Sequence, residues 1–120
     1  MATIKSYTDL EQSRKLAEFL PIESADMCYR YSVELNAKVH SPIPLPKNYV
    51  DKITYYYTPC WSLATLLDIL QYPTLFQRAD KKWGCTVWID ATKPYSISHK
   101  DNPLDACVAM IEKLHELNLL

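Results

Sequence analysis

Cysteine and histidine are the residue types of this chain that could carry out catalysis, and Cys60 is the first candidate. Cys60 follows Thr58-Pro59, a pair typical of a helix start, so we predict that it lies in the first turn of a helix. The helix dipole would lower the pKa of a thiol at this position. With His40 or His99 as a base, Cys60 would then act as a nucleophile. We favour the alternative, a buried and unreactive Cys60, because free cysteine is among the most buried residue types.

The spacing of possible ligands argues against metal and phosphate sites. The four cysteines are separated by 32, 25 and 22 residues, without the close pairs typical of zinc sites: Cys28, Cys60, Cys85 and Cys107. His99 and Asp101 form a His-x-Asp pair that lacks a third ligand. Gly84 is the single glycine of the sequence, whereas loops that bind phosphate need several. We therefore expect no metal and no cofactor.

Aromatic residues are the stronger signal for binding. Tyr56 and Trp88 lie on predicted strands, in positions that face away from the helix-covered side of a sheet. Gly84 and Thr86 would stand between them on the same side. Exposed aromatic side chains are enriched at protein-binding sites, so we predict a protein partner or self-association through Tyr56 and Trp88. The alternative is that these side chains pack under loops or against the proline-containing residues 42–46.

The charge and hydropathy of the chain exclude several classes of function. The formal net charge is -1, from 13 basic and 14 acidic residues among 120. This balance predicts no binding to nucleic acid or to an anionic membrane. The first ten residues contain no apolar run, so we expect no signal peptide. The most apolar stretch, residues 61–70, is too short to span a bilayer. We expect a cytoplasmic protein with free thiols.

Three segments combine a capping residue with an apolar stripe at helical spacing. The first has the capping-box pattern Thr8-Asp9-Leu10-Glu11, and a short helical turn is expected after it at residues 22–26. The first predicted helix covers residues 9–20. The second begins at Thr58-Pro59 and ends before Pro73, and the third begins at Asn102-Pro103 and ends at Asn118.

Alternating apolar and polar residues predict the strands. Residues 29–39 alternate strictly, as one long strand or as two strands broken near Asn36. Residues 42–46 carry alternate prolines and predict an extended connector, and residues 74–82 predict an exposed loop. Further strands are predicted over residues 52–57, 83–90 and 95–98. The order α-β-β-α-β-β-α predicts an α+β fold, with three helices on one face of an antiparallel sheet of about four strands, in a single domain over residues 1–120.

Two segments at predicted helix starts also resemble segments of known proteins. The segments Pro59-Cys60-Trp61-Ser62-Leu63-Ala64-x-Leu66-Leu67 and Asn102-Pro103-Leu104-Asp105-Ala106-Cys107-Val108-x-Met110-Ile111-x-x-Leu114 occur in this order. The chain resembles small uncharacterised proteins carried by prophages and conjugative elements of Bacteroides-type gut bacteria. That resemblance implies a phage or mobile-element context and a host or phage protein as partner, and it supplies no catalytic residue. A non-enzymatic protein-interaction module is the leading hypothesis, and a cysteine-dependent hydrolase or transferase is the alternative.

Overall fold

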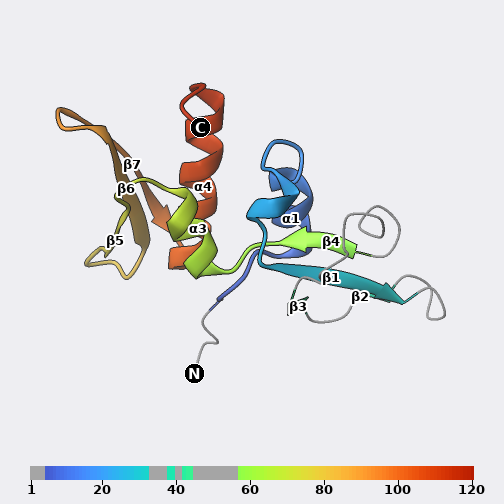
Figure 1. The fold of residues 1–120 in the computed structure, drawn as a ribbon. Coiled ribbons are helices and arrows are strands. Elements are labelled where there is room, and N and C mark those ends of the chain that lie inside the picture. The colour runs from blue at the N-terminus through green and yellow to red at the C-terminus, as the bar shows by residue number, and fades with distance from the viewer. Residues whose placement is uncertain (1–4, 33–37, 40–41, 45–56) are drawn as a thin grey trace. The chain divides into compact units, whose positions relative to one another are not determined.

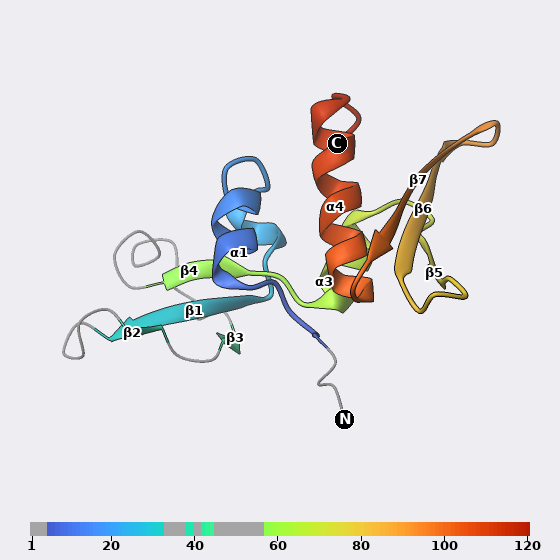
Figure 2. The ribbon, with the colours of Figure 1, turned by 180° about the vertical axis from the view of Figure 1, so that it is seen from behind.

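A computed structural model describes residues 5–32, 38–39, 42–44 and 57–120, and the fold is drawn in Figures 1 and 2. The described residues form α-helices and antiparallel strands, which confirms the predicted α+β class. Backbone contacts group the chain into two compact units. One unit is Thr8–Ser62, and the other combines Met1–Tyr7 with Leu63–Leu120. The single domain stays a prediction.

The first helix of the Thr8–Ser62 unit, α1 (Leu10–Leu16), begins one residue later than the sequence indicates. Its N-cap is Asp9, whose carboxylate accepts a hydrogen bond from the backbone N–H of Gln12 at 2.8 Å. The side-chain oxygen of Gln12 in turn accepts a hydrogen bond from the Asp9 backbone N–H at 3.1 Å. The predicted cap at Thr8 is therefore wrong, because the Thr8 side chain is buried and makes other contacts. The expected short turn forms as the 3-10 helix η1 (Ile22–Ser24).

A four-stranded antiparallel arrangement centres on β1 (Met27–Ser32). The other strands pair with β1: β2 (Lys38–Val39), β3 (Ile43–Pro44) and β4 (Tyr57–Cys60). Because β1 and β2 are antiparallel partners, the two-strand interpretation of residues 29–39 is the correct one. The extended connector contributes β3. Most of the predicted strand 52–57, including Tyr56, lies outside the described residues.

The helix predicted from Thr58-Pro59 is wrong at its start, since Thr58 and Pro59 belong to β4 and pair with β1. The helix α3 (Leu63–Ile69) begins later. The backbone between β4 and α3 already forms hydrogen bonds. The Thr8 N–H donates to the Trp61 carbonyl oxygen, and the Trp61 N–H donates to the Thr8 hydroxyl. The Ser62 N–H donates to the Asp26 carboxylate at 2.9 Å. These contacts hold the segment extended, so the helical pattern takes effect only after Ser62.

The second unit contains a three-stranded antiparallel sheet in the order β5-β6-β7. Its strands are β5 (Thr74–Gln77), β6 (Trp83–Asp90) and β7 (Lys93–Lys100). Strand β6 confirms the predicted strand over 83–90, and β7 is longer than the predicted 95–98. The expected loop over 74–82 is wrong in its first half, where β5 forms. The described strands thus make two sheets rather than one.

The helix α4 (Pro103–Glu116) covers one face of this sheet and also packs against α3 (Figures 1 and 2). Its start is as predicted: Asn102 is the N-cap, its side chain accepts the Asp105 N–H at 2.8 Å, and Pro103 opens the first turn. Asn118 takes the left-handed conformation with φ 57°, as predicted for the helix end. Among the described residues, no helix is long and apolar enough to cross a membrane.

Candidate functional site

Cys60 lies at the end of a strand and in the core, not at the N-terminus of a helix. Its side chain has 0% exposure. The Thr8 hydroxyl approaches the Cys60 sulfur at 3.5 Å, and the sulfur approaches the Thr8 carbonyl oxygen at 3.4 Å. Tyr29 donates its hydroxyl to the same carbonyl at 2.7 Å. Thr8 is also within 2.7 Å of the Ser13 hydroxyl. These bonds satisfy the polar atoms that surround the thiol.

The environment of Cys60 disfavours the thiolate. Burial raises the pKa of the Cys60 thiol, although the hydroxyls of Thr8 and Ser13 oppose this effect. Burial also raises the pKa of Cys28 to about 11. A nucleophilic cysteine needs a lowered pKa and access to substrate. The premise of the catalytic hypothesis, a thiol activated by a helix N-terminus, is therefore wrong.

Thiol labelling tests this conclusion. In the folded protein we expect Cys60 to react with iodoacetamide at least about a hundredfold more slowly than free cysteine at pH 8, because reaction requires opening of the core. Peptide mass spectrometry measures the extent of labelling at each cysteine. Protein unfolded in urea is the control, in which all four cysteines should react. Rapid labelling of Cys60 alone in the folded protein would restore it as a nucleophile.

The histidines do not complete a site in the described residues. His40 lies outside them, and His99 is exposed on β7 of the other unit, where its Nδ1 is 2.9 Å from the Ser98 hydroxyl. The carboxylate of Asp101 forms an ion pair with Lys82. No group of three or more His, Cys, Asp or Glu side chains in the described part of the chain could hold a metal ion.

The other two cysteines lie in the core of the second unit. Cys85 of β6 and Cys107 of α4 both have 0% exposure, as their positions on apolar stripes predict. The pKa of the Cys107 thiol is raised, first by its hydrogen bond with Cys85 and then by burial. Both residues therefore contribute to packing between the helix and the sheet.

The face of the β5-β6-β7 sheet opposite α4 is the most distinctive surface of this unit. Strand register places its side chains together, because cross-strand partners share a face. Thr74, Thr86 and Ser96 align across the three strands, Phe76 lies beside Gly84, and Trp88 pairs with Pro94. We call this surface the open face and define it by six residues: Thr74, Phe76, Thr86, Trp88, Pro94 and Ser96.

The open face is uncharged and partly aromatic. The Trp88 side chain is 42% exposed, and Phe76 is half-buried. A Cβ placed on Gly84 would lie 2.3 Å from the Phe76 ring, so the ring covers the glycine and lies down on the sheet. The hydroxyls of Thr86 and Ser96 are 2.7 Å apart. Because each hydroxyl can donate and accept, the open face can form hydrogen bonds with both donor and acceptor groups.

The outer edge of β7 is protected against pairing with another strand. Pro94 lacks a backbone N–H, and Lys113 of α4 donates its ammonium to the Ser96 carbonyl oxygen at 3.4 Å. Proline and lysine are common devices that prevent edge pairing. The outer edge of β7 is therefore poorly suited to pair with another strand.

Sequence reasoning placed Trp88 correctly but missed two members of the open face. Thr74 and Phe76 fall in the segment interpreted as a loop. A signal was present: Thr74-Leu75-Phe76-Gln77 is a short run rich in strand formers that precedes the turn residues of 78–82. Tyr56, the other predicted binding residue, is outside the described part of the chain.

Comparisons with known proteins provide no additional assignment. No protein-family model matches the chain, no curated protein is similar to it, and no solved structure matches its fold.

Proposed function

We propose that this chain is a small non-enzymatic protein-interaction module and that the open face binds its protein partner. The exposure of Trp88 on an uncharged sheet face carries the proposal. Tryptophan is enriched among the residues that dominate binding energy at protein interfaces. The proposal includes the setting that the sequence resemblance implies, a phage or mobile element whose product acts on a host or phage protein.

The size of the open face supports a partner other than a second copy of the chain. Eight-residue strands extend roughly 26 Å, and three strands span about 14 Å, so the face covers at most about 400 Å². Two copies stacked face to face would bury about 800 Å², whereas stable interfaces bury about 1,200–2,000 Å². A different protein could contact the open face and the loops at its rim together.

The test is a comparison of two variants with matched exposure. Trp88→Thr removes the indole and keeps a residue suited to a strand. Leu117→Ala alters a side chain that is 47% exposed at the end of α4, away from the open face. We expect Trp88→Thr to weaken binding of the partner by at least about thirtyfold, as for an interface hot spot, and Leu117→Ala to leave it unchanged.

The measurement is quantitative affinity capture from cells of the source organism, followed by titration of the captured protein against each purified variant. Circular dichroism confirms that both variants are folded. Equal affinity of Trp88→Thr and the wild type for the captured protein would overturn the proposal. Light scattering on the free protein tests whether the open face binds a second copy of the chain. A dimer that dissociates in the Trp88→Thr variant would identify a second copy, and not a different protein, as the partner.

A further inference from the structure

The two edges of the β5-β6-β7 sheet are built differently. The β7 edge contains Pro94 and is bonded by Lys113, and both residues hinder pairing with another strand. The β5 edge, Thr74–Gln77, contains no proline and no charged residue, and its register with β6 is regular. Its only protective feature is its short length of four residues. The β5 edge is therefore the one at which a further strand fits this sheet.

The hydrogen bonds of the β5–β6 hairpin show which backbone groups face outward. The Arg78 N–H donates to the Lys82 carbonyl oxygen at 2.7 Å, so these two residues form a hydrogen-bonded pair. Such pairs alternate with non-hydrogen-bonded pairs along an antiparallel ladder. Counting back along β5, Thr74 and Phe76 also direct their backbone groups toward β6. The residues between them must direct theirs away from the sheet.

Leu75 and Gln77 are these outward-facing residues, and each presents one N–H and one C=O group at the edge. In the described part of the chain, these four backbone groups have no hydrogen-bond partner. All residues of β5 are at least partly exposed, including the large apolar side chains of Leu75 and Phe76. A further strand would bond to the four groups and cover part of this apolar surface.

We infer that two copies of the chain pair through β5, antiparallel about a two-fold axis at Phe76, and join their sheets into one continuous sheet. Leu75 then pairs with Gln77 of the second copy, and Gln77 pairs with Leu75 of the second copy. These two pairs contain four backbone hydrogen bonds. Phe76 faces its own counterpart as a non-hydrogen-bonded pair. The inference goes beyond the proposed function, because the open face takes no part in this pairing.

This register is the one that uses both outward-facing residues fully. A shift of either strand by two residues would bring Pro73 or Ala79 into the ladder. Pro73 has no N–H to donate, and Ala79 belongs to the turn after β5. The Phe76 ring lies over Gly84 of β6 and so points away from the edge. It therefore leaves the approach of a second strand unobstructed.

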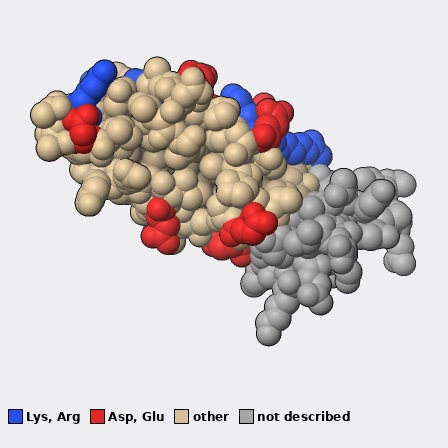
Figure 3. All heavy atoms as spheres, turned by 45° about the horizontal axis from the view of Figure 1, so that its top comes forward, with Lys and Arg blue, Asp and Glu red and all other residues tan. Residues whose placement is uncertain are grey.

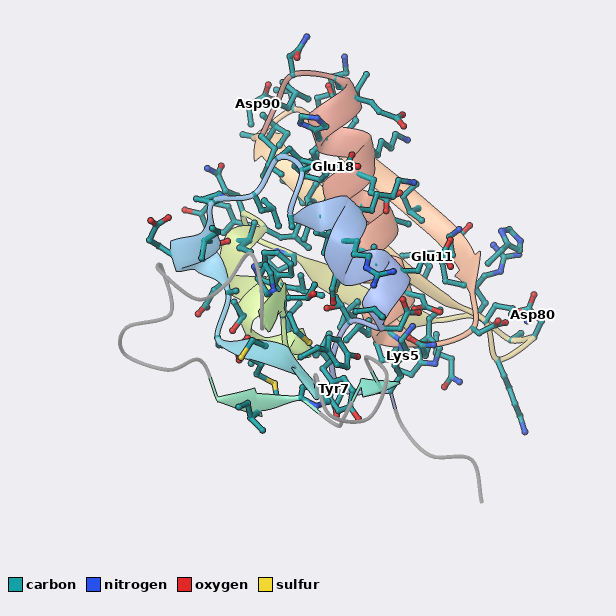
Figure 4. All side chains as sticks on the ribbon, turned by 90° about the vertical axis from the view of Figure 1, so that its right-hand side faces the viewer. Lys5, Tyr7, Glu11, Glu18, Asp80 and Asp90 are labelled. Carbon is teal, nitrogen blue, oxygen red and sulfur yellow. The ribbon has the colours of Figure 1, made fainter. Side chains whose placement is uncertain are left out.

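The distribution of charge permits two copies to meet at this edge. Much of the described surface that Figure 3 shows belongs to uncharged residues, and β5 itself has none that is charged. The β5–β6 turn, which contains Asp80, and the β6–β7 hairpin, which contains Asp90, lie at opposite ends of the sheet (Figure 4). Antiparallel pairing places the Asp80 turns of the two copies at opposite ends of the joint sheet. The charged turns therefore do not meet.

The area of the joint sheet supports a second copy as the occupant of this edge. Antiparallel neighbours in one sheet share the same sides, so the two open faces form one surface of about 800 Å², twice the area of one. A partner that covers this surface would bury about 1,600 Å² in total, the usual size of a stable interface. The dimer thus removes the size limit of a single open face.

Sedimentation velocity of the full chain from about 5 µM to about 500 µM tests the inference. We expect a reversible dimer with a Kd on the order of 10–100 µM, because four hydrogen bonds and a small contact area give a weak interface. Gln77→Pro removes an outward-facing N–H and spares the bonds to β6, as an edge proline does. It should weaken the dimer at least about tenfold. Circular dichroism checks that the variant is folded.

The matched control is Gln77→Thr, which loses the same side chain and its bond to the Lys81 carbonyl oxygen but keeps the backbone N–H. It should leave the dimer unchanged. Trp88→Thr should also leave it unchanged, since Trp88 lies on β6. Amide hydrogen exchange of the wild type needs no variant: exchange at Leu75 and Gln77 should slow at least about threefold between the two ends of the concentration range.

Three results would overturn the inference. The first is a chain that stays monomeric at about 500 µM. The second is a dimer that Gln77→Pro leaves intact or that Trp88→Thr dissociates. The third is protection of Leu75 and Gln77 that appears only when the captured partner is added, which would identify a strand of that protein as the occupant of the edge. Capture of the partner by wild type and not by Trp88→Thr would still support the proposed function in each case.

Discussion

Replacing Trp61 with alanine is expected to lower the free energy of unfolding by about 3–5 kcal/mol, a large share of the about 5–15 kcal/mol that stabilises a domain. The Trp61 side chain has 0% exposure. Its indole Nε1 donates to the Ser24 hydroxyl at 3.0 Å. Alanine removes this bond and leaves a cavity in the core of the Thr8–Ser62 unit. Urea denaturation followed by circular dichroism measures the change.

Two milder variants separate packing from hydrogen bonding at this position. Trp61→Phe keeps much of the ring volume and loses the indole N–H. Ser24→Ala keeps the indole and removes its acceptor. We expect each to cost about 1–2 kcal/mol, the usual effect of losing one partly buried hydrogen bond with little loss of volume. A Trp61→Ala variant as stable as the wild type would show that the indole is not packed in the core in solution.

Replacing Gly84 with alanine is expected to cost about 2–3 kcal/mol through overpacking. A Cβ at this position would stand 2.3 Å from the Phe76 ring and 2.7 Å from the carbonyl oxygen of Ile97. The ring can rotate away, but the carbonyl belongs to β7 and moves only with the strand. The same substitution should also lift Phe76 from the open face and weaken binding of the partner.

Thr86→Ala, at the next outward position of β6, is the control and should cost less than about 1 kcal/mol. A thermodynamic cycle with Phe76→Ala isolates the clash with the ring, because the double variant should cost less than the sum of the two single variants. A Gly84→Ala variant with wild-type stability and wild-type partner binding would contradict the arrangement of Phe76 over Gly84.

Local sequence signals predicted well those elements whose ends are set by nearby residues. The start of α4 needs only Asn102, Pro103 and Asp105, which lie within one turn of each other. Thr8 and Thr58 resemble caps equally well in sequence. Both are used in long-range contacts instead: Thr8 bonds to Trp61, and Thr58 pairs with Tyr29. Tertiary contacts therefore override the capping signal where a residue has a distant partner.

The candidate site was predictable only in part for the same reason. Alternation along β6 placed Trp88 on the side away from the core, because one strand is enough for that inference. The position of Phe76 over Gly84 depends on pairing between β5 and β6, which a single-strand pattern does not contain. The pKa of Cys60 depends on its burial beside Thr8, a residue 52 positions away. A helix-start pattern at Thr58-Pro59 could not indicate this environment.

The most direct test of the open face as a binding surface is a chemical-shift titration of the isotope-labelled full chain with the captured partner. Assignment of the indole N–H signals of the three tryptophans allows each to be followed separately. We expect the Trp88 indole signal and the amides of Thr74, Phe76, Thr86 and Ser96 to shift or broaden, while the Trp61 indole stays unchanged. Shifts that cluster elsewhere, with Trp88 unaffected at saturation, would contradict the account.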